Sequence, residues 1–372
     1  MVSIAVSFLI MIIAVSVSSG FRNEIRDGIS ALTGDVQLLP ADMNSISETD
    51  PVTPTRSFLK ALDSLPGTRS VTPVLYRAGI VKSGEDIHGV LFKGVPRSDP
   101  SDTVKLGVSI PSRLSDLLGF RVGDRMPAYF VGERVKVRNF VVRDIYEGIM
   151  DGTDNLIVLA DLADLQRLNG WQEGEVSMLE IALQPAFRNV SGMKEMTARI
   201  GGLALNRPGD GDDPLVAVSV TDRYPQLFDW LNLIDFNVLF ILILMTIVAG
   251  FNMISGLLIL LFRNISTIGT LKSMGMTDRS IAEVFLRVAS GIVLKGMAVG
   301  NGIALLLCAV QGGTHVLKLN PENYFVPFVP VHVNLPMILA ADAASFAVIL
   351  LLLLIPCLFI AKVDPAQTVR AQ

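Results

Sequence analysis

Charge is scarce in this sequence. Asp, Glu, Lys and Arg make up 18% of the 372 residues, whereas about a quarter is usual for a soluble protein. Hydrophobic residues make up 51%, and the mean hydropathy is +0.52. Charged residues are sparsest at the N-terminus and in the last third, while the stretch between them reads as an ordinary globular domain. This distribution indicates an integral membrane protein, and the net charge of −4 gives no electrostatic reason to expect nucleic acid as a partner.

Residue types used for metal binding and covalent catalysis are also few. The two cysteines, Cys308 and Cys357, lie in apolar stretches, so we expect small buried hydrophobic side chains there and neither a disulfide nor a metal site. The three histidines have no partner at metal-ligand spacing. The sequence contains no GxxxxGK(S/T) phosphate loop and no GxSxG nucleophile motif. We therefore expect a non-catalytic chain with no metal and no cofactor bound to it.

Four segments are apolar enough to cross a bilayer, whose hydrocarbon core needs about 20 helical residues. They cover residues 2–19, 236–262, 291–310 and 335–360. The first could instead be a secretory signal peptide, because small residues follow it, but nothing basic precedes it. The fold class we expect is an α-helical membrane protein with four transmembrane helices and a large α+β domain inserted between the first and the second.

Basic residues give the orientation of the spans. Six fall in the loop after the second span and in the C-terminal tail, against one, Lys318, in the other short loop. We therefore expect a multi-pass inner-membrane protein. The loop after its second span and both termini should lie in the cytoplasm, and the large domain should lie in the periplasm. The predicted order is span 1–20, periplasmic domain 21–235, span 236–262, cytoplasmic loop 263–287, span 288–310, periplasmic loop 311–334, span 335–361 and cytoplasmic tail 362–372.

The inserted domain mixes short strands and helices. Alternating or β-branched runs predict strands at residues 36–39, 71–81, 89–94, 134–142, 156–159, 178–183 and 216–220. Helical patterns fall at residues 54–65, 112–118, 162–168 and 190–200. Thr53 is the expected N-cap of the first of these helices, with Pro54 at its first position. Elements in this order are typical of an α+β domain.

Two segments of the inserted domain read as loops, residues 40–55 and 206–214. The second contains Asp210, Asp212 and Asp213. Three carboxylates at short spacing could bind calcium, but the EF-hand pattern is absent, and a solvated turn is the favoured interpretation.

A short helix is expected directly after the second span. Ile265, Ile268, Leu271 and Met274 recur every three residues and predict one apolar stripe along it. Gly275 fits the end of that helix, and Asp278 is the expected cap of the next one. An exposed apolar stripe at the membrane surface calls for a partner, although packing against the protein's own helices remains an alternative.

The third and fourth spans contain residues that bear on helix packing. Gly296, Gly300 and Ala304 are four residues apart, and small residues at this spacing let another helix approach closely. Lys295 lies near the cytoplasmic edge, where its side chain can snorkel to water. For Asp342 two interpretations stay open, outward snorkelling or lining of a pore.

These segments resemble the FtsX/MacB-type permeases of ABC transporters, and within them the lipoprotein-releasing LolC/LolE branch. The resemblance covers nearly the whole chain. It is carried by residues 18–21 (SSGF), 114–125 (LSDLLGFRVGDR), 227–231 (LFDWL), 249–252 (AGFN) and 268–275 (IGTLKSMG), and by the glycine-spaced third span.

The resemblance implies mechanotransmission. A separate LolD-like ATPase, which binds the ATP and magnesium, would grip a coupling helix on each of two permease subunits, and its closure would move the outer domain. The second permease would be another copy or a paralogue. The coupling residues would be Ile265, Ile268, Gly269, Leu271, Lys272, Met274 and Gly275.

The same resemblance implies how cargo is handled. Lipoprotein cargo would enter between the first and second spans of facing subunits, with Phe21, Phe251 and Asn252 as contacts, and would pass to a periplasmic carrier. Two alternatives remain open, a MacB-like efflux permease for peptides or toxins and an FtsX-like scaffold that activates a cell-wall hydrolase.

The sequence departs from the family pattern in two places. Asn264 stands where relatives often have an acidic residue, which would weaken a contact with the ATPase. The chain also begins inside the first span, where relatives carry a cytoplasmic N-terminal segment, so a truncated or misassigned start is an open interpretation.

Overall fold

The structure is a computed structural model that describes residues 1–41, 51–97, 105–132, 134–147, 156–206, 214–320, 324 and 326–357. Most of the predicted loop 40–55, the acidic stretch 207–213 with its three aspartates, and the tail 362–372 lie outside the described residues. The chain divides into two compact units. One unit consists of Met1–Glu24, Asp229–Lys318 and Phe328–Gln372, and the other of Ile25–Phe228 and Leu319–Pro327.

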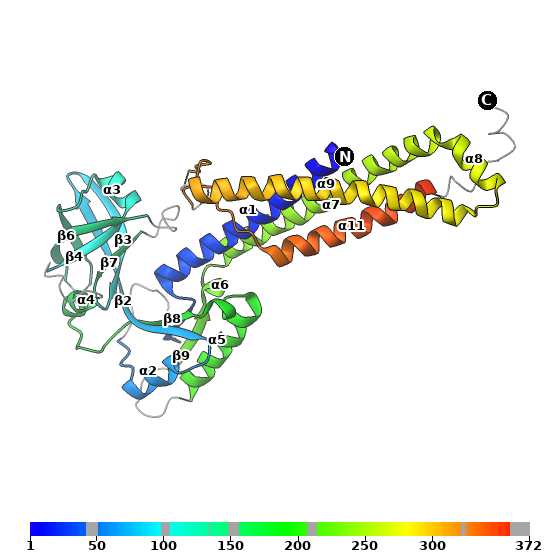
Figure 1. Cartoon of the computed structure of the whole chain (residues 1–372). Coiled ribbons are helices and arrows are strands. Elements are labelled where there is room, and N and C mark those ends of the chain that lie inside the picture. The colour runs from blue at the N-terminus through cyan, green and yellow to red at the C-terminus, as the bar shows by residue number, and fades with distance from the viewer. Residues whose placement is uncertain are drawn as a thin grey trace. The chain divides into compact units, whose positions relative to one another are not determined.

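The first unit is a bundle of long helices (Figure 1). Its helices are α1 (Val2–Thr33), α7 (Pro225–Arg263), α8 (Ile265–Ser273), α9 (Asp278–Thr314) and α11 (Leu335–Cys357). Four of these, all but α8, are long and apolar enough to cross a membrane. The helices α1, α7 and α9 extend well beyond the predicted spans, and α1 and α9 run through the glycines at the span edges, Gly20 and Gly291. The predicted boundaries at residues 20 and 235 therefore fall inside continuous helices.

The bundle is held together by two clusters of buried apolar side chains. The first joins α1, α7, α9 and α11 and includes Phe8, Met253, Val293 and Ile349. The second joins the same four helices through Ile12, Val15, Val238, Ala304 and Ile338.

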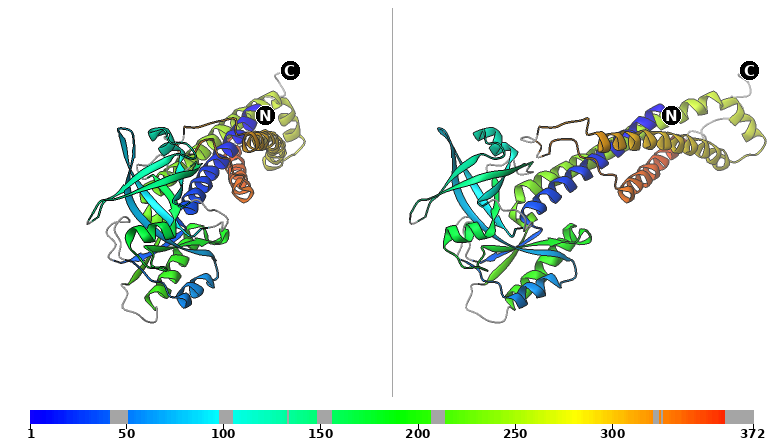
Figure 2. Two further views of the ribbon diagram at one scale, coloured as in Figure 1. Left: turned by 90° about the vertical axis from the view of Figure 1, so that its left-hand side faces the viewer. Right: turned by 60° about the vertical axis from the view of Figure 1, so that its left-hand side comes forward.

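The second unit is built on one nine-stranded sheet with helices packed against it (Figure 2). Its strands are β1 (Val36–Pro40), β2 (Thr68–Ser83), β3 (Asp86–Val95), β4 (Gly107–Pro111), β5 (Arg125–Phe130), β6 (Lys136–Tyr146), β7 (Ile157–Asp161), β8 (Met178–Leu183) and β9 (Leu215–Ser219). Its helices are α2 (Arg56–Asp63), α3 (Ser112–Leu118), α4 (Leu162–Asn169), α5 (Val190–Leu205) and α6 (Val220–Arg223), with a 3-10 turn at Pro185–Phe187.

The long strand β2 belongs to both halves of this unit. The strand order is β3-β7-β4-β6-β5-β2-β8-β1-β9, and an additional β2–β3 pairing closes the first six strands into a ring. Residues 68–74 of β2 pair with β8, whereas residues 75–83 pair with β3. The ring encloses a core in which Phe92 lies between Phe130 and Phe140, with ring centroids 4.9 and 5.1 Å away.

The remaining strands carry the second core. β8, β1 and β9 form an open sheet covered by α2 and α5, with Leu38, Leu62, Ile181 and Ile200 among the buried side chains. One β2 strand thus joins a closed barrel to an open α+β layer, which agrees with the predicted α+β class.

All seven predicted strands and all four predicted helices of this domain are present, with shifted ends. The strands β4 and β5 were not predicted. β4 is short and buried from Val108 to Pro111, so it shows no alternation. β5 does alternate, with Met126, Ala128 and Phe130 buried, but Pro127 within it argues against a strand. The cap prediction at Thr53 is wrong, because the α2 helix begins at Arg56 and Thr55 accepts the hydrogen bond from the Phe58 N–H.

Candidate functional site

The connection between α7 and α9 is a sharp elbow built around α8. A single residue, Asn264, separates α7 from α8, and its side chain donates to the Leu260 carbonyl, at 2.8 Å. The α8 helix ends at Ser273, and the predicted stop, Gly275, follows its C-cap Met274 with a φ of +91°, in the left-handed region that favours glycine. The cap of α9 is Thr277, which accepts from the Ser280 N–H, and not Asp278 as the sequence suggested. The elbow is therefore fixed by local backbone chemistry at both ends of α8.

The apolar stripe of α8 turns mostly toward the bundle. Ile268 is 1% exposed within the core that also contains Leu257 and Ile281, and Leu271 packs against the same core. Gly269 is buried and Ile265 is half-buried. Only Met274, which is 78% exposed, presents its side chain to the outside. The stripe thus follows the alternative in which it packs against the protein's own helices.

The outward face of α8 consists of small hydroxyl side chains that end at Met274. Ser266, Thr267, Thr270 and Ser273 are all exposed, and their spacing places them on one side of the helix. The hydroxyls of Thr270 and Ser273 donate to the carbonyls of Ser266 (3.0 Å) and Thr270 (2.7 Å). Because these donors are already satisfied, another protein can cover the face without leaving them unpaired. Sequence reasoning missed this face, although the spacing of the hydroxyl residues, opposite the stripe, could have revealed it.

Lys272 links the two helices that meet at the elbow, α8 and α9. Its ammonium group forms an ion pair with Asp278 at 2.8 Å, and its side chain is only 10% exposed. The pair links the end of α8 to the first turn of α9. Lys272 is thus placed to hold the elbow in shape and is not an exposed contact of its own.

The three small residues of α9 all face α1. A β-carbon built at Gly300 would lie 2.3 Å from the Ala5 carbonyl oxygen, and one built at Gly296 would lie 2.9 Å from the Ile4 side chain. Ala304 is fully buried beside Ile12 and Val15. Since the contacts on α1 advance in step with those on α9, the two helices run parallel, as expected for the first and third spans.

The predicted cargo contacts do not lie together. Phe21 packs edge-on against Trp230, with centroids 6.4 Å apart. Asn252 instead donates to Ser3 at 2.6 Å. Ser3 and Phe21 are both on α1, and the rise of about 1.5 Å per residue separates them by about 27 Å. The neighbouring Phe251 is 64% exposed.

The junction of α1 and α7 next to Phe21 is polar. Arg22 forms an ion pair with Asp235 and donates to Asn232 at 3.2 Å. The Ser18 hydroxyl donates to the other oxygen of Asp235 at 2.6 Å. This cluster, which we call the α1–α7 clasp (Ser18, Arg22, Asn232 and Asp235), ties the two helices together.

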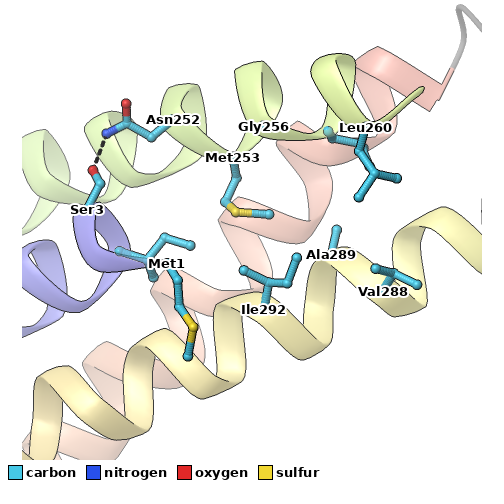
Figure 3. A pocket seen from close by; sticks show the side chains of 11 residues that line it. Met1, Ser3, Asn252, Met253, Gly256, Leu260, Val288, Ala289 and Ile292 are labelled. Carbon is cyan, nitrogen blue, oxygen red and sulfur yellow. Dashed lines mark hydrogen bonds between the residues drawn. The ribbon is translucent and has the colours of Figure 1, made fainter. Parts of the chain in front are cut away.

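A cavity lies at the other end of α1, beside Asn252. It has a volume of about 290 Å³ and is lined by the start of α1, the second half of α7 and α9. Figure 3 shows the Ser3–Asn252 hydrogen bond at one side and the side chains of Met253, Ala289 and Ile292 nearby. The lining is mostly apolar, so the cavity suits a hydrocarbon group.

The last turn of α1 is anchored in the sheet by buried charges. Lys93 on β3 donates to the Leu32 carbonyl and pairs with Glu180 on β8 at 2.5 Å. The other oxygen of Glu180 accepts from the Tyr76 hydroxyl at 2.6 Å. Burial raises the pKa of Tyr76 well above its usual value, and the charge of Glu180 adds to this effect. Asp35, directly after α1, is fully buried and pairs with Arg188 at 3.1 Å.

The described residues contain no group of three or more His, Cys, Asp or Glu side chains that could hold a metal ion. The features that the structure brings together are instead mechanical. They are the elbow at α8, which has a buried side and an exposed face, the closely packed helices α1 and α9, and the last turn of α1, which is anchored in the sheet.

Comparison with known proteins shows what this sequence is similar to. Residues 239–365 match the family described as FtsX-like permease C-terminal. Over 100% of the chain and 93% of the relative, the sequence is 21% identical to the lipoprotein-releasing system transmembrane protein LolE of Haemophilus influenzae. It is 22% and 20% identical to the LolC proteins of Xylella fastidiosa and Neisseria meningitidis serogroup B, over 99% of the chain and 92% of each relative.

Two solved structures are also similar. The extracellular domain of the noncanonic ABC-type transporter YknZ is 12% identical, with a TM-score of 0.33 over 50% of this chain and 98% of that chain. The periplasmic region of MacB from Actinobacillus actinomycetemcomitans is 13% identical, with a TM-score of 0.34 over 55% of this chain and 98% of that chain.

Proposed function

We propose that this FtsX-like permease of the inner membrane is the non-catalytic membrane subunit of an ABC transporter that releases lipoproteins from that membrane. The observation that carries the proposal is the similarity to LolE and LolC proteins over the whole chain. The family match alone covers only residues 239–365. The outer domain and α1, where the cargo of such a system would be handled, are included in the full-length similarity.

The contact with a separate LolD-like ATPase is assigned to the outward face of α8. The predicted coupling residues Ile268, Gly269 and Leu271 support this face from behind, since they pack into the bundle. Met274 and the hydroxyl residues at 266, 267, 270 and 273 form the contact surface. A push on α8 passes directly to α7 and α9, because only Asn264 separates α8 from α7 and the Lys272–Asp278 pair ties it to α9.

Motion reaches the outer domain, which we place in the periplasm, through α1 and α7. Both helices continue without a break beyond the apolar spans, α1 to Thr33 and α7 from Pro225. The end of α1 is fixed to β3 and β8 by the Lys93–Glu180 pair, so a displacement of α1 must move these strands. This arrangement suits mechanotransmission between the ATPase and a periplasmic lipoprotein carrier.

Cargo is proposed to enter between α1 and α7, facing a second permease copy or paralogue. The clasp of Arg22 and Asp235 closes the outer junction of these helices beside Phe21 and Trp230. Opening it would expose aromatic surface suited to acyl chains. Phe251 and Asn252 lie too far along the helices to share this contact, so among the predicted cargo residues only Phe21 is retained at the entrance.

The test changes the exposed face and leaves the buried stripe intact. Met274→Asp combined with Thr270→Asp puts two charges where the ATPase is expected to cover the surface, and burying them unpaired should weaken binding by about tenfold or more. The control is Glu283→Lys, a charge change at an exposed position of α9. Co-purification with the ATPase and stimulated ATP hydrolysis are measured on protein shown to insert normally. Equal binding by the double variant and the control would remove α8 from the mechanism.

A further inference from the structure

Four carboxylic acids are buried in the described part of the chain, and one of them differs from the rest. Asp35, Asp164 and Glu180 each pair with an arginine or lysine. The fourth, Asp342, is 5% exposed on the inward side of α11, between Ile338 and Ser345. Its hydrogen-bond partner is an amide, since Asn301 on α9 donates its Nδ2 to Asp342 Oδ2 at 2.6 Å. Within the described residues, Asp342 forms no ion pair with a lysine or an arginine.

The surrounding helices offer no counter-charge. The stretches of α1 and α7 within the membrane, residues 2–21 and 236–262, contain no charged residue. On α9, residues 288–314 contain only Lys295, which is exposed and about 9 Å along the helix from Asn301 at the usual rise per residue. The other titratable group of this stretch is Cys308, a thiol on the same helix. A carboxylate at this place would be an isolated charge within a hydrocarbon environment, which is strongly unfavourable.

Asn301 supplies a second, independent observation. Its Oδ1 atom is buried and has no hydrogen-bond partner. A buried acceptor of this kind is costly to leave unsatisfied. An ionised Asp342 has no hydrogen to donate, so it leaves Asn301 Oδ1 unpaired in every orientation of the amide.

We infer that Asp342 is a proton-binding site within the membrane. Its carboxyl group carries the proton and donates it in a hydrogen bond to Asn301 Oδ1, while Asn301 Nδ2 donates to the other carboxyl oxygen. The acid and the amide then form a neutral ring of two hydrogen bonds that satisfies both side chains and removes the charge. The proton comes from water, and no other group changes state.

This neutral pair clamps α11 to α9 in the middle of the bundle. One turn away, Ser345 bonds to Thr246 on α7 at 2.9 Å, so α11 is tied to two neighbours by uncharged hydrogen bonds. Apolar packing lies on both sides of this polar belt, with Ile338 on one and Ile349 on the other. Separating α9 from α11 breaks both bonds of the acid–amide ring at once. We therefore expect the proton on Asp342 to be released only if separation of these helices admits water to the carboxyl group.

The test is infrared spectroscopy of the full-length protein in lipid nanodiscs at neutral pH. Exposed carboxyl groups and those paired with cations are ionised there, so the protein should show a protonated-carboxyl C=O band that arises from Asp342. The band should disappear in Asp342→Asn, which keeps the shape and both hydrogen bonds, and move to higher frequency in Asn301→Leu, which removes the hydrogen-bond partner. It should survive in the matched control Ser345→Ala, which removes the neighbouring hydroxyl of the polar belt.

The same samples give a second readout that does not depend on the spectrum. Asp342→Asn should keep the thermal stability of the wild-type protein, whereas Asp342→Leu, which leaves Asn301 unpaired, should lower it. Absence of a protonated-carboxyl band from the wild-type protein overturns the inference, as does its persistence in Asp342→Asn. If Asp342→Asn does not fold, the inference is still tested by the wild-type spectrum and by the shift of the C=O band frequency in Asn301→Leu.

Discussion

The close contact of α1 and α9 at Gly300 gives a prediction whose size follows from the structure. In Gly300→Ala the new β-carbon would lie 2.3 Å from the carbonyl oxygen of Ala5, a backbone atom that cannot move aside by changing rotamer. Reaching ordinary contact at 3.4 Å requires the two helices to part locally by about 1.1 Å. Van der Waals packing is the main force between helices in a membrane, so this separation removes contacts along the whole interface.

The matched control is Gly302→Ala on the same helix. A β-carbon at Gly302 meets nothing within 4 Å, so the control shows only the gain from a better helix former, about 0.5–1 kcal/mol. For Gly300→Ala the cost of overpacking, about 1–3 kcal/mol, should outweigh that gain. We expect the bundle of Gly300→Ala to unfold at lower detergent concentration and that of Gly302→Ala at equal or higher concentration.

The buried thiol of Cys308 provides the assay. It lies on α9 two turns beyond Gly300 and is protected in the folded bundle. In a Cys357→Ser background, labelling of Cys308 by a thiol reagent during titration with a denaturing detergent reports the opening of the bundle. If Gly300→Ala and Gly302→Ala gave the same midpoint, the close approach of α1 and α9 would be refuted.

Three further predictions concern other parts of the molecule. Lys93→Met leaves Glu180 buried without its cation and should destabilise the outer domain by about 3–5 kcal/mol, measured by thermal unfolding, while the double variant Lys93→Met with Glu180→Gln should recover much of the loss. Because the pKa of Tyr76 is raised in the folded protein, its neutral phenol stabilises the fold at all pH values below the unfolded pKa of about 10, and stability should fall as the pH rises beyond this value. Tyr76→Phe should weaken this pH dependence of stability. Spectrophotometric titration of that variant should show one late-titrating tyrosine fewer. The side chains of Ser18 and Asp235 are in contact, so cysteines introduced at both positions should form a disulfide that locks the α1–α7 clasp. This disulfide should stop transport until a reductant is added. Transport that continues with the disulfide intact would place cargo entry elsewhere.

Much of the fold can be predicted from the sequence because its signals are local. The four apolar runs are long and almost free of charge, and strands such as Met178–Leu183 coincide with β-branched or alternating patterns. The continuation of α1 to Thr33 could not be read in the same way, since Arg22 and Arg26 end the hydrophobic signal without ending the helix. The sharing of β2 between a closed barrel and an open sheet depends on long-range pairing, which no local pattern encodes.

Some features of the candidate site could likewise be predicted from the sequence, and others could not. The glycine spacing of α9 predicts a close helix contact, and Gly275 predicts the end of α8, because both depend on backbone geometry. The direction in which the α8 stripe points depends on how that helix folds back on Ile281 and Leu257, so periodicity could not tell partner binding from internal packing. The pairing of Asp342 with Asn301 joins residues 41 positions apart in the chain, and only the structure brings them together.

Reconstitution in proteoliposomes tests whether the protein releases lipoproteins from a membrane. Proteoliposomes would contain this chain, its second permease and the ATPase, together with a lipid-anchored lipoprotein, and the lipoprotein transferred to a soluble acceptor would be measured with and without ATP. We expect ATP-dependent transfer by the wild-type protein and by Glu283→Lys, and its loss in Met274→Asp with Thr270→Asp. ATP hydrolysis without any transfer of lipoprotein by the wild-type complex would contradict a lipoprotein-releasing function.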